Sequence, residues 1–441
     1  MNAILILKEN LQLIVLVLLT ILVGMVEPNL GILFSVGVLA ILGFKARFVE
    51  LVLLLLVMLL LSDSRQDSLY FFQSAKKVGM ILFGLLVWLS ARKYELEKNI
   101  IFLTFSPFLL WSLGVALFLS PEVNTSIQKT VSYGILFFAV PSLVQILMKN
   151  DRERFLRSLV MMIAVYLAIG FLLYLGGREI SQLAGRFRGL MGNPNGLGII
   201  SFLFIILFDT VNTRHPDLFT KRVTLLIWGL LLVNIILCGS RSALAAVLIF
   251  MIFRSFKVFR GFLGVLIFVS SLFAYQSFTL ALPQIIEALN LSEYLRIETL
   301  ETGSGRLIAW EFAWSQIQEA FYTGKGFNYT ELLFGENYKA LSRLGHQGNA
   351  HNSFLTFWLD TGLVGLSLYM IAFFLIFFKV SKISKNGQAI MYAVLFSLTF
   401  ESWLTASLNP MTITLLIIIS IIIYGAENEE SEQAPKAGPI Q

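Results

Sequence analysis

The chain of 441 residues is poor in charge: charged residues make up 14% of it, against about a quarter of an ordinary soluble protein. Hydrophobic residues make up 57%. A soluble protein cannot bury that proportion of apolar surface, so lipid must be the solvent for much of it. The composition therefore indicates an integral membrane protein.

Other chemical groups are scarce as well. The single cysteine, Cys238, excludes an internal disulfide and a metal site built from cysteines. The short polar segments carry scattered carboxylates, no pair of which has metal-ligand spacing. The chain has no glycine-rich phosphate loop and no nucleotide-binding fingerprint. These absences disfavour chemistry that depends on a metal or a nucleotide, and no cofactor is expected.

Long apolar stretches recur along the chain, separated by short polar segments. They predict an all-α fold, a polytopic transmembrane helix bundle of about 12–14 spans. The first stretch could also be a signal peptide, but it lacks a small-residue cleavage site and another apolar run follows at once. The expected spans are 11–27, 30–44, 48–62, 76–91, 100–120, 127–148, 155–176, 194–212, 222–239, 241–256, 258–281, 353–378, 388–407 and 411–424.

The basic residues predict an orientation. With the N-terminus in the cytoplasm, most of the 33 lysines and arginines fall on inner loops, as the positive-inside rule requires. The expected parts are then a transmembrane bundle at 1–281, a long extracytoplasmic loop at 282–352, further transmembrane helices at 353–426, and a disordered cytoplasmic tail at 427–441.

Several arginines break this rule by lying on the outer side. Each could extend toward lipid headgroups or pair with a local acid such as Glu179, but as a set they predict an anion site. They are Arg178, Arg186, Arg188, Arg241 and Arg306.

Three outer motifs each begin a helix that runs back inward. They are Asn193-Pro194-Asn195, Ser240-Arg241-Ser242 and His351-Asn352-Ser353. Each has a capping side chain and presents unpaired backbone N–H groups and a positive dipole end to the outer face, where anions collect.

Arg306 begins a further helix within the long loop. Apolar residues at helical spacing predict an amphipathic helix over about 305–321, capped by Ser304. An arginine in the first turn opposes the helix dipole, which is explained more readily if an anion sits there. Trp310 and Trp314 on this helix could stack on sugar rings, but their spacing favours packing onto the bundle.

His351 is the histidine best placed for chemistry. A helix N-terminus and nearby arginines favour its neutral imidazole, which can accept a proton, although a lone histidine can also be structural. Asp360 and Glu401 fall inside expected spans, where a carboxylate usually signals function or a buried pair. A substrate that arrives already activated, such as a lipid-linked pyrophosphate, would fit both the arginines and the membrane.

Four motifs in order resemble the O-antigen ligase and polysaccharide polymerase superfamily. They are RFRGLMGNPNGLG, CGSRSALAAVLIF, SGRLIAWEFAWSQIQEAFYTGKGF and HNSFLTFWLDTGLVGL, spread over about residues 180–370. The family's HN motif is usually followed by a glutamate before G-x-x-G, and Asp360 occupies that place here.

The resemblance implies a metal-independent, inverting glycosyltransferase on the outer face of the bacterial inner membrane. Its donor would be a glycan on undecaprenyl pyrophosphate, and its acceptor a glycan or lipid-linked hydroxyl in O-antigen, capsule or exopolysaccharide assembly. By motif match, Arg241 and Arg306 hold the pyrophosphate and His351 is the general base. Secondary candidates that line the same cavity are Arg186, Arg188, Asn193 and Asn195.

Two alternatives stay open. A polymerase is slightly favoured over a ligase within the family, and the moderate length of the outer loop argues against the protein-glycosylating branch. A polytopic transporter or flippase of lipid-linked glycans is a different class of function. Transporters often show paired halves with broken helices at matching positions, and the sequence shows no such symmetry.

Overall fold

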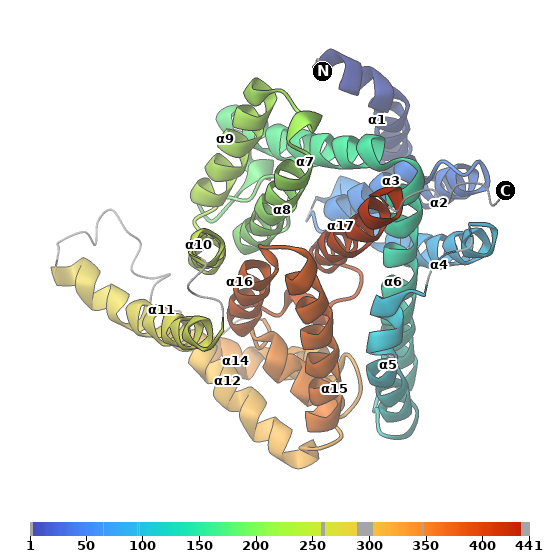
Figure 1. Cartoon of the computed structure of the whole chain (residues 1–441). Helices are drawn as coiled ribbons and strands as arrows, with labels where there is room; N and C mark the ends of the chain where they lie inside the picture. The colour runs from blue at the N-terminus through green and yellow to red at the C-terminus, as the bar shows by residue number, and fades with distance from the viewer. Residues whose placement is uncertain are drawn as a thin grey trace.

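The computed structural model describes residues 3–64, 66–94, 96, 98–256, 261–288, 303–344 and 348–433. Over these residues the chain is almost entirely helical, with one two-stranded hairpin, so the expected all-α class is confirmed. Figure 1 shows the helices gathered into one bundle.

Each expected span overlaps a helix. In the first half the elements are α1 (Ala3–Val26), α2 (Pro28–Phe44), α3 (Phe48–Ser62), η1 (Asp67–Leu69), α4 (Phe71–Lys93), α5 (Ile100–Phe118), α6 (Val123–Asn150), α7 (Arg152–Leu175), η2 (Glu179–Ser181), α8 (Pro194–Arg214) and η3 (Pro216–Leu218), with strands β1 (Gln182–Leu183) and β2 (Arg186–Phe187). In the second half they are α9 (Lys221–Leu237), α10 (Arg241–Ser255), α11 (Phe262–Ala288), α12 (Gly303–Ile317), η6 (Gln318–Ala320), α13 (Tyr329–Glu336), α14 (Tyr338–Arg343), α15 (Ser353–Ile383), α16 (Gly387–Phe400), η7 (Trp403–Thr405) and α17 (Pro410–Gln433).

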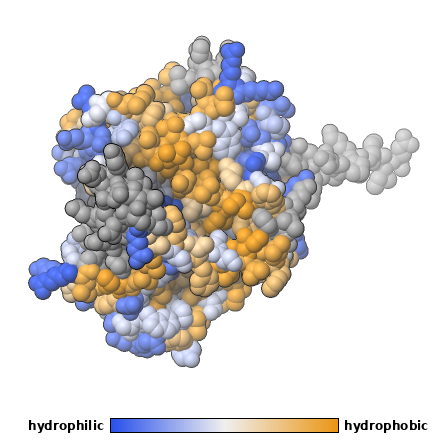
Figure 2. Space-filling model, turned by 90° about the vertical axis from the view of Figure 1, so that its left-hand side faces the viewer, coloured by the Kyte–Doolittle hydropathy of each residue, from blue (hydrophilic) through white to orange (hydrophobic). Residues whose placement is uncertain are grey.

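The helices differ in how deeply they are buried. In the most apolar stretch of α8, 89% of residues are buried inside the protein, and in that of α6 72% are, but in α11 only 11% are. α8 and α6 are therefore central, and α11 lies at the edge of the bundle (Figure 1). Figure 2 shows a broad hydrophobic area across one face of the molecule, with hydrophilic residues mostly toward its margins.

The helix lengths fit a membrane. Among the residues that the structure describes, seven helices are long and apolar enough to cross a bilayer, and five more apolar helices are shorter. Large apolar side chains such as Leu225, Leu226 and Phe273 are more than two-thirds exposed, which water would disfavour and lipid would not. The chain is thus a multi-pass membrane protein.

The expected end of one span is wrong. The sequence predicted one continuous span over 388–407, but α16 ends at Phe400 and Glu401 adopts an extended backbone. Polar side chains hold the non-helical segment that follows: Thr405 donates to the Ser402 carbonyl, and Thr412 to that of Ala406. Non-helical backbone at this depth is stable because it is buried in protein and its polar groups are paired.

The ends of two other helices also differ from expectation. α12 begins at Gly303, one residue before the expected cap Ser304, because the helix extends further toward the N-terminus than its apolar pattern. α17 continues to Gln433, so helix runs into the stretch where a tail was expected from residue 427, and residues 434–441 lie outside the described chain.

The long loop is fastened to the bundle through Asp360. Its buried carboxylate accepts hydrogen bonds from the backbone N–H of Asn328 (3.1 Å) and of Thr330 (2.8 Å), at the start of α13. Just beyond it, α15 kinks at Gly362, whose φ of 70° is a conformation that glycine adopts without strain. A side chain at Gly362 would also collide with the backbone of Tyr322. Asp360 therefore holds the loop in place.

The starts of α8 and α10 lie together at one end of the bundle. Gly198 near the start of α8 packs closely against Ser240 and Ala243 at the start of α10. The opposite ends of α6, α8 and α17 also meet, since Gly425 packs against Met148 and Arg214. The 21 residues of α8, at a rise of 1.5 Å per residue, separate its two ends by about 30 Å.

Asn99 repairs a gap that a proline creates in α6. Pro141 has no N–H, so the carbonyl of Phe137 lacks its usual helical partner. The side-chain amide of Asn99 donates to the carbonyls of Phe137 (3.2 Å) and Phe138 (2.9 Å) and to the hydroxyl of Ser142 (3.0 Å). Its oxygen meanwhile caps α5 at the N–H of Phe102.

We expect Asn99→Ala to lower the free energy of unfolding by about 1–3 kcal/mol, because it leaves buried carbonyls unpaired. Thermal unfolding of the purified protein in detergent measures this as a lower Tm. Asn29→Ala is the matched control, since Asn29 bonds only with exposed Glu27. Equal Tm values for the two variants would contradict the assigned role of Asn99.

Candidate functional site

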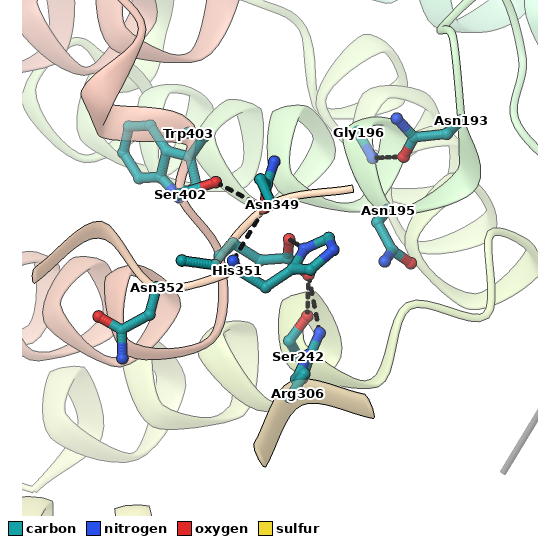
Figure 3. A network of polar contacts seen from close by, with 12 residues as sticks. Asn193, Asn195, Gly196, Ser242, Arg306, Asn349, His351, Asn352, Ser402 and Trp403 are labelled. Carbon is teal, nitrogen blue, oxygen red and sulfur yellow. Dashed lines mark hydrogen bonds and ion pairs between the residues drawn. The ribbon is translucent and has the colours of Figure 1, made fainter. Parts of the chain in front are cut away.

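A buried carboxylate joins three separate elements at the end of the bundle where α8 and α10 begin. Oε1 of Glu401 accepts from Nη2 of Arg306 (3.0 Å) and from the hydroxyl of Ser242 (3.3 Å). Its Oε2 lies 3.5 Å from Nδ1 of His351. We call Glu401, Arg306, His351 and the nearby Arg186 and Arg241 the Glu401 cluster. Figure 3 shows side chains from α10, α12 and the segment before α15 converging on one point.

His351 is held in an unusual backbone conformation. Its φ of 44° is left-handed, which is uncommon for a residue other than glycine and tends to occur at functional sites. Its N–H donates to Oδ1 of Asn349 (2.8 Å), which also accepts from the hydroxyl of Ser402 (3.2 Å). The next residue, Asn352, caps α15 through the N–H groups of Phe354 and Leu355. Bonds on both sides therefore fix the position of the imidazole.

Trp310 of α12 supports the same segment. Its indole N–H donates to the carbonyl of Ala350 (2.9 Å), the residue before His351. Its ring lies near Phe400, at the end of α16. Trp314 instead packs against Phe321 and Trp358. Both tryptophans pack the helix onto the bundle, as its spacing favoured.

A tight hairpin presents Arg186 to the cluster. Strands β1 and β2 are joined by Ala184 and Gly185, which both have positive φ, as a two-residue hairpin turn requires. Arg186 donates to the carbonyl of Cys238 (2.9 Å) and to Oδ1 of Asn195 (3.1 Å). Burial lowers the pKa of its guanidinium, whereas the nearby Glu401 carboxylate acts in the opposite direction.

Arg241 has unused hydrogen-bonding capacity. It is the first residue of α10, and among the residues that the structure describes its buried Nη1 has no hydrogen-bond partner. It interacts electrostatically with Arg306 and Arg186, which repel it. Three guanidinium groups thus lie near one another, and the Glu401 carboxylate interacts with those of Arg306 and Arg186. The excess positive charge favours binding of an anion.

Arg188 and Asn193 organise the loop behind this cluster. Arg188 is 7% exposed and donates to the backbone carbonyls of Ile180 (3.1 Å) and Gly192 (3.2 Å). Oδ1 of Asn193 accepts from the N–H of Gly196 (2.7 Å), so it caps α8 as expected from the Asn-Pro-Asn motif. Of the secondary candidates, Arg186 and Asn195 contact each other beside the cluster.

Residues 225–370 match the family model described as O-antigen ligase. Over these residues the chain is similar to O-antigen ligases. The match covers about a third of the 441 residues and contains Arg241, Arg306 and His351. No curated protein matches the chain.

The O-antigen ligase match leaves out two parts of the cluster that the fold supplies. Arg186 precedes the matched residues, and Glu401 follows them. The sequence singled out Glu401 as a carboxylate within an expected span, but gave no partner for it. Ser242 and Asn349 were not recognised as site residues, because a serine at a helix start and an asparagine in a loop are common capping residues.

No group of three or more His, Cys, Asp or Glu side chains in the described part of the chain is arranged to hold a metal ion. The positive charge at this site comes from arginine side chains.

We expect Arg306 and Glu401 to be energetically coupled, because removing either leaves the other without its partner in a partly buried setting. In a double-mutant cycle with Arg306→Gln and Glu401→Gln, the two effects on unfolding should fail to add by about 1–3 kcal/mol. The measurement is thermal or denaturant unfolding of all four proteins in detergent.

The control cycle is Lys325→Gln with Glu319→Gln. This pair is also an ion pair, but more than half of the Glu319 side chain is exposed. We expect its coupling to stay below about 1 kcal/mol. If the effects of the Arg306 and Glu401 substitutions on unfolding are additive, the two side chains are not energetically coupled.

Proposed function

We propose that this protein is a membrane glycosyltransferase that moves a glycan from undecaprenyl pyrophosphate to the hydroxyl of an acceptor glycan. The observation that carries the proposal is the Glu401 cluster, where an excess of guanidinium groups lies beside a fixed imidazole. The O-antigen ligase match supports transfer of this general kind. The reaction would serve O-antigen, capsule or exopolysaccharide assembly at the bacterial inner membrane.

Arg241 and Arg306 would bind the pyrophosphate. When the bond between the anomeric carbon and the phosphate oxygen breaks, negative charge develops on the departing group, and fixed cations stabilise it. Arg241 has a guanidinium nitrogen to offer, because its Nη1 is unpaired among the contacts of the described chain. Arg306 uses one N–H group for Glu401, and a guanidinium has five. Arg186 and Asn195 would extend the same surface.

His351 would act as the general base. Its Nδ1 faces Glu401, which as a carboxylate can only accept a hydrogen bond. That contact favours the tautomer with its proton on Nδ1 and leaves the lone pair of Nε2 to accept a proton. The acceptor hydroxyl would lose its proton to Nε2 as its oxygen attacks the anomeric carbon. Attack opposite the leaving pyrophosphate inverts the configuration and needs no metal ion.

The carrier lipid has an apolar path below Arg241. Leu244, Leu248 and Ile252 follow Arg241 on one face of α10 at helical spacing, and all three are more than 40% exposed. A polyprenyl chain lying along this face would place its pyrophosphate beside Arg241. The site would then receive its donor from within the membrane and its acceptor from the outer side.

Orientation is part of the proposal. The N- and C-termini would be cytoplasmic and the Glu401 cluster extracytoplasmic, consistent with the basic residues at the opposite helix ends. Polymerisation is favoured slightly over ligation. A transporter or flippase is the alternative, but the hydrogen bonds that fix His351 suit a catalytic base better than a transport path.

We expect deletion of the gene to change the size of the surface polysaccharide, and His351→Ala to fail to restore it. Single-unit glycans would mean a lost polymerase, and accumulated lipid-linked polymer a lost ligase. Gel sizing of the surface glycan and extraction of carrier lipids measure both. Because general-base catalysis supplies about 10²–10⁴-fold, the variant's transfer rate should fall by at least that lower figure.

His215→Ala is the matched control, because His215 follows α8 at the opposite end of the bundle. It should restore the polysaccharide fully. Full restoration by a well-expressed His351→Ala protein would remove His351 as the base. Unchanged glycan with intermediate retained inside the cell would favour the flippase.

Arg241→Lys should also be poorly tolerated. Lysine keeps the charge but loses the planar pair of donors that matches phosphate oxygens, so we expect transfer to fall about tenfold or more while expression is unchanged. Arg178→Lys, in the loop segment before η2, is the control. Equal activity of the two variants in the complementation assay would show that Arg241 makes no directed contact with the donor.

A further inference from the structure

A carboxylate outside the Glu401 cluster lies where a helix dipole disfavours it. Asp63 is the C-cap of α3, so the negative end of the dipole of α3 opposes its charge. The side chain is partly buried, and Lys76 of α4 interacts with it electrostatically. The proposed glycan transfer gives Asp63 no role. Its contacts with the start of α8 account for an acid at this position.

Asp63 reaches the positive end of that second helix. Its Oδ2 accepts from the backbone N–H of Gly192 (3.1 Å), the residue before the cap Asn193 of α8. The same oxygen lies 3.6 Å from the point where the Cβ of a side chain on Gly196 would stand, in the first turn of α8. A helix start attracts anions, and here the protein itself supplies one through Asp63.

The turn that contains Gly192 is held by further contacts. Arg188 donates to the carbonyl of Gly192 (3.2 Å), and the N–H of Met191 donates to the carbonyl of Arg188 (3.0 Å). The hydroxyl of Tyr166 in α7 donates to the sulfur of Met191 (3.0 Å). The turn is thus closed within itself and fastened to α7, and Asp63 fastens it to the end of α3.

This turn leads directly to Asn195, whose position affects the donor site. Oδ1 of Asn195 accepts from Arg186 (3.1 Å), the guanidinium that the hairpin presents to the Glu401 cluster. Figure 3 shows the side chain of Asn195 beside the site, at the start of α8. The hydrogen bonds and the short backbone segment between them therefore connect Asp63 to Arg186.

We propose that Asp63 is a positioning residue for the donor. It anchors the turn that sets Asn195 and, through Asn195, holds the guanidinium of Arg186 beside the pyrophosphate. The inference rests on the proposed function, because Arg186 matters in this way only if the site binds a pyrophosphate. Asp63 itself does not touch the donor, so losing it weakens donor binding through Arg186.

The test is binding of undecaprenyl pyrophosphate to the purified full-length protein in detergent, followed by native mass spectrometry. Asp63→Ala should weaken binding about tenfold, because a hydrogen bond to a charged group is lost. Asp63→Asn should restore most of the binding, since its side-chain oxygen can still accept from Gly192. Arg186→Gln should also weaken binding, and adding Asp63→Ala to it should have no further effect.

Asp67→Ala is the matched control, because Asp67 is an exposed acid in the neighbouring η1. It should bind the carrier like the unchanged protein. Hydrogen exchange of the backbone at residues 188–195 gives a second readout that needs no carrier. Exchange there should rise in Asp63→Ala and stay unchanged in Asp67→Ala.

Three results would overturn the proposal. The first is unchanged exchange in Asp63→Ala, and the second is unchanged carrier binding despite raised exchange. The third is an equal loss of binding with and without Arg186, which would show a general structural role for Asp63. If the unchanged protein shows the expected exchange but binds no carrier, the proposed function fails and this role for Asp63 fails with it. If Asp63→Ala does not fold, Asp63→Glu carries the same comparison, because it keeps the charge but displaces the carboxylate.

Discussion

The contact on which the site depends is that between the buried carboxylate of Glu401 and the groups around it. A carboxylate removed from water is unfavourable unless cations and hydrogen-bond donors compensate it. Arg306 and Ser242 supply these to Oε1, and His351 faces Oε2. One charge thereby links the starts of α10 and α12 to the segment before α15. Without Glu401, three arginines and a histidine would face one another with no anion between them.

The break after α16 makes this arrangement possible. If α16 continued through Glu401, the helix would set the direction of the Glu401 side chain. The backbone of Glu401 would then form its hydrogen bonds within the helix. Instead the backbone is extended at Glu401, and the carbonyl of Glu401 accepts from the hydroxyl of Ser353 (2.8 Å) at the start of α15. The segment that positions the carboxylate thus also holds the helix that follows His351. Asp360 of α15 separately fastens the long loop to the bundle through the start of α13.

Much of this could be predicted from the sequence. Apolar runs predicted the membrane helices, and the capping residues Asn193 and Asn352 were also predicted correctly. Both an apolar run and a helix cap are local features of the sequence. The partner of Glu401 could not be predicted, because Arg306 is 95 residues away and no local pattern encodes that contact. Nor could the end of α16, since Trp403 and Leu404 lie just after Phe400 and extend the apolar run past Glu401. Arg188 was grouped with the site by its position, but its contacts with two carbonyls depend on how the loop folds.

We propose that the guanidinium groups around Glu401 bind a phosphorylated carrier. A structure of the protein with bound undecaprenyl pyrophosphate is the decisive measurement. We expect phosphate oxygens within hydrogen-bond distance of Arg241 and Arg306, with Nε2 of His351 open toward the space where an anomeric carbon would sit. A pyrophosphate bound elsewhere, with the contact between Arg306 and Glu401 closed and Arg241 still unpaired, would contradict it.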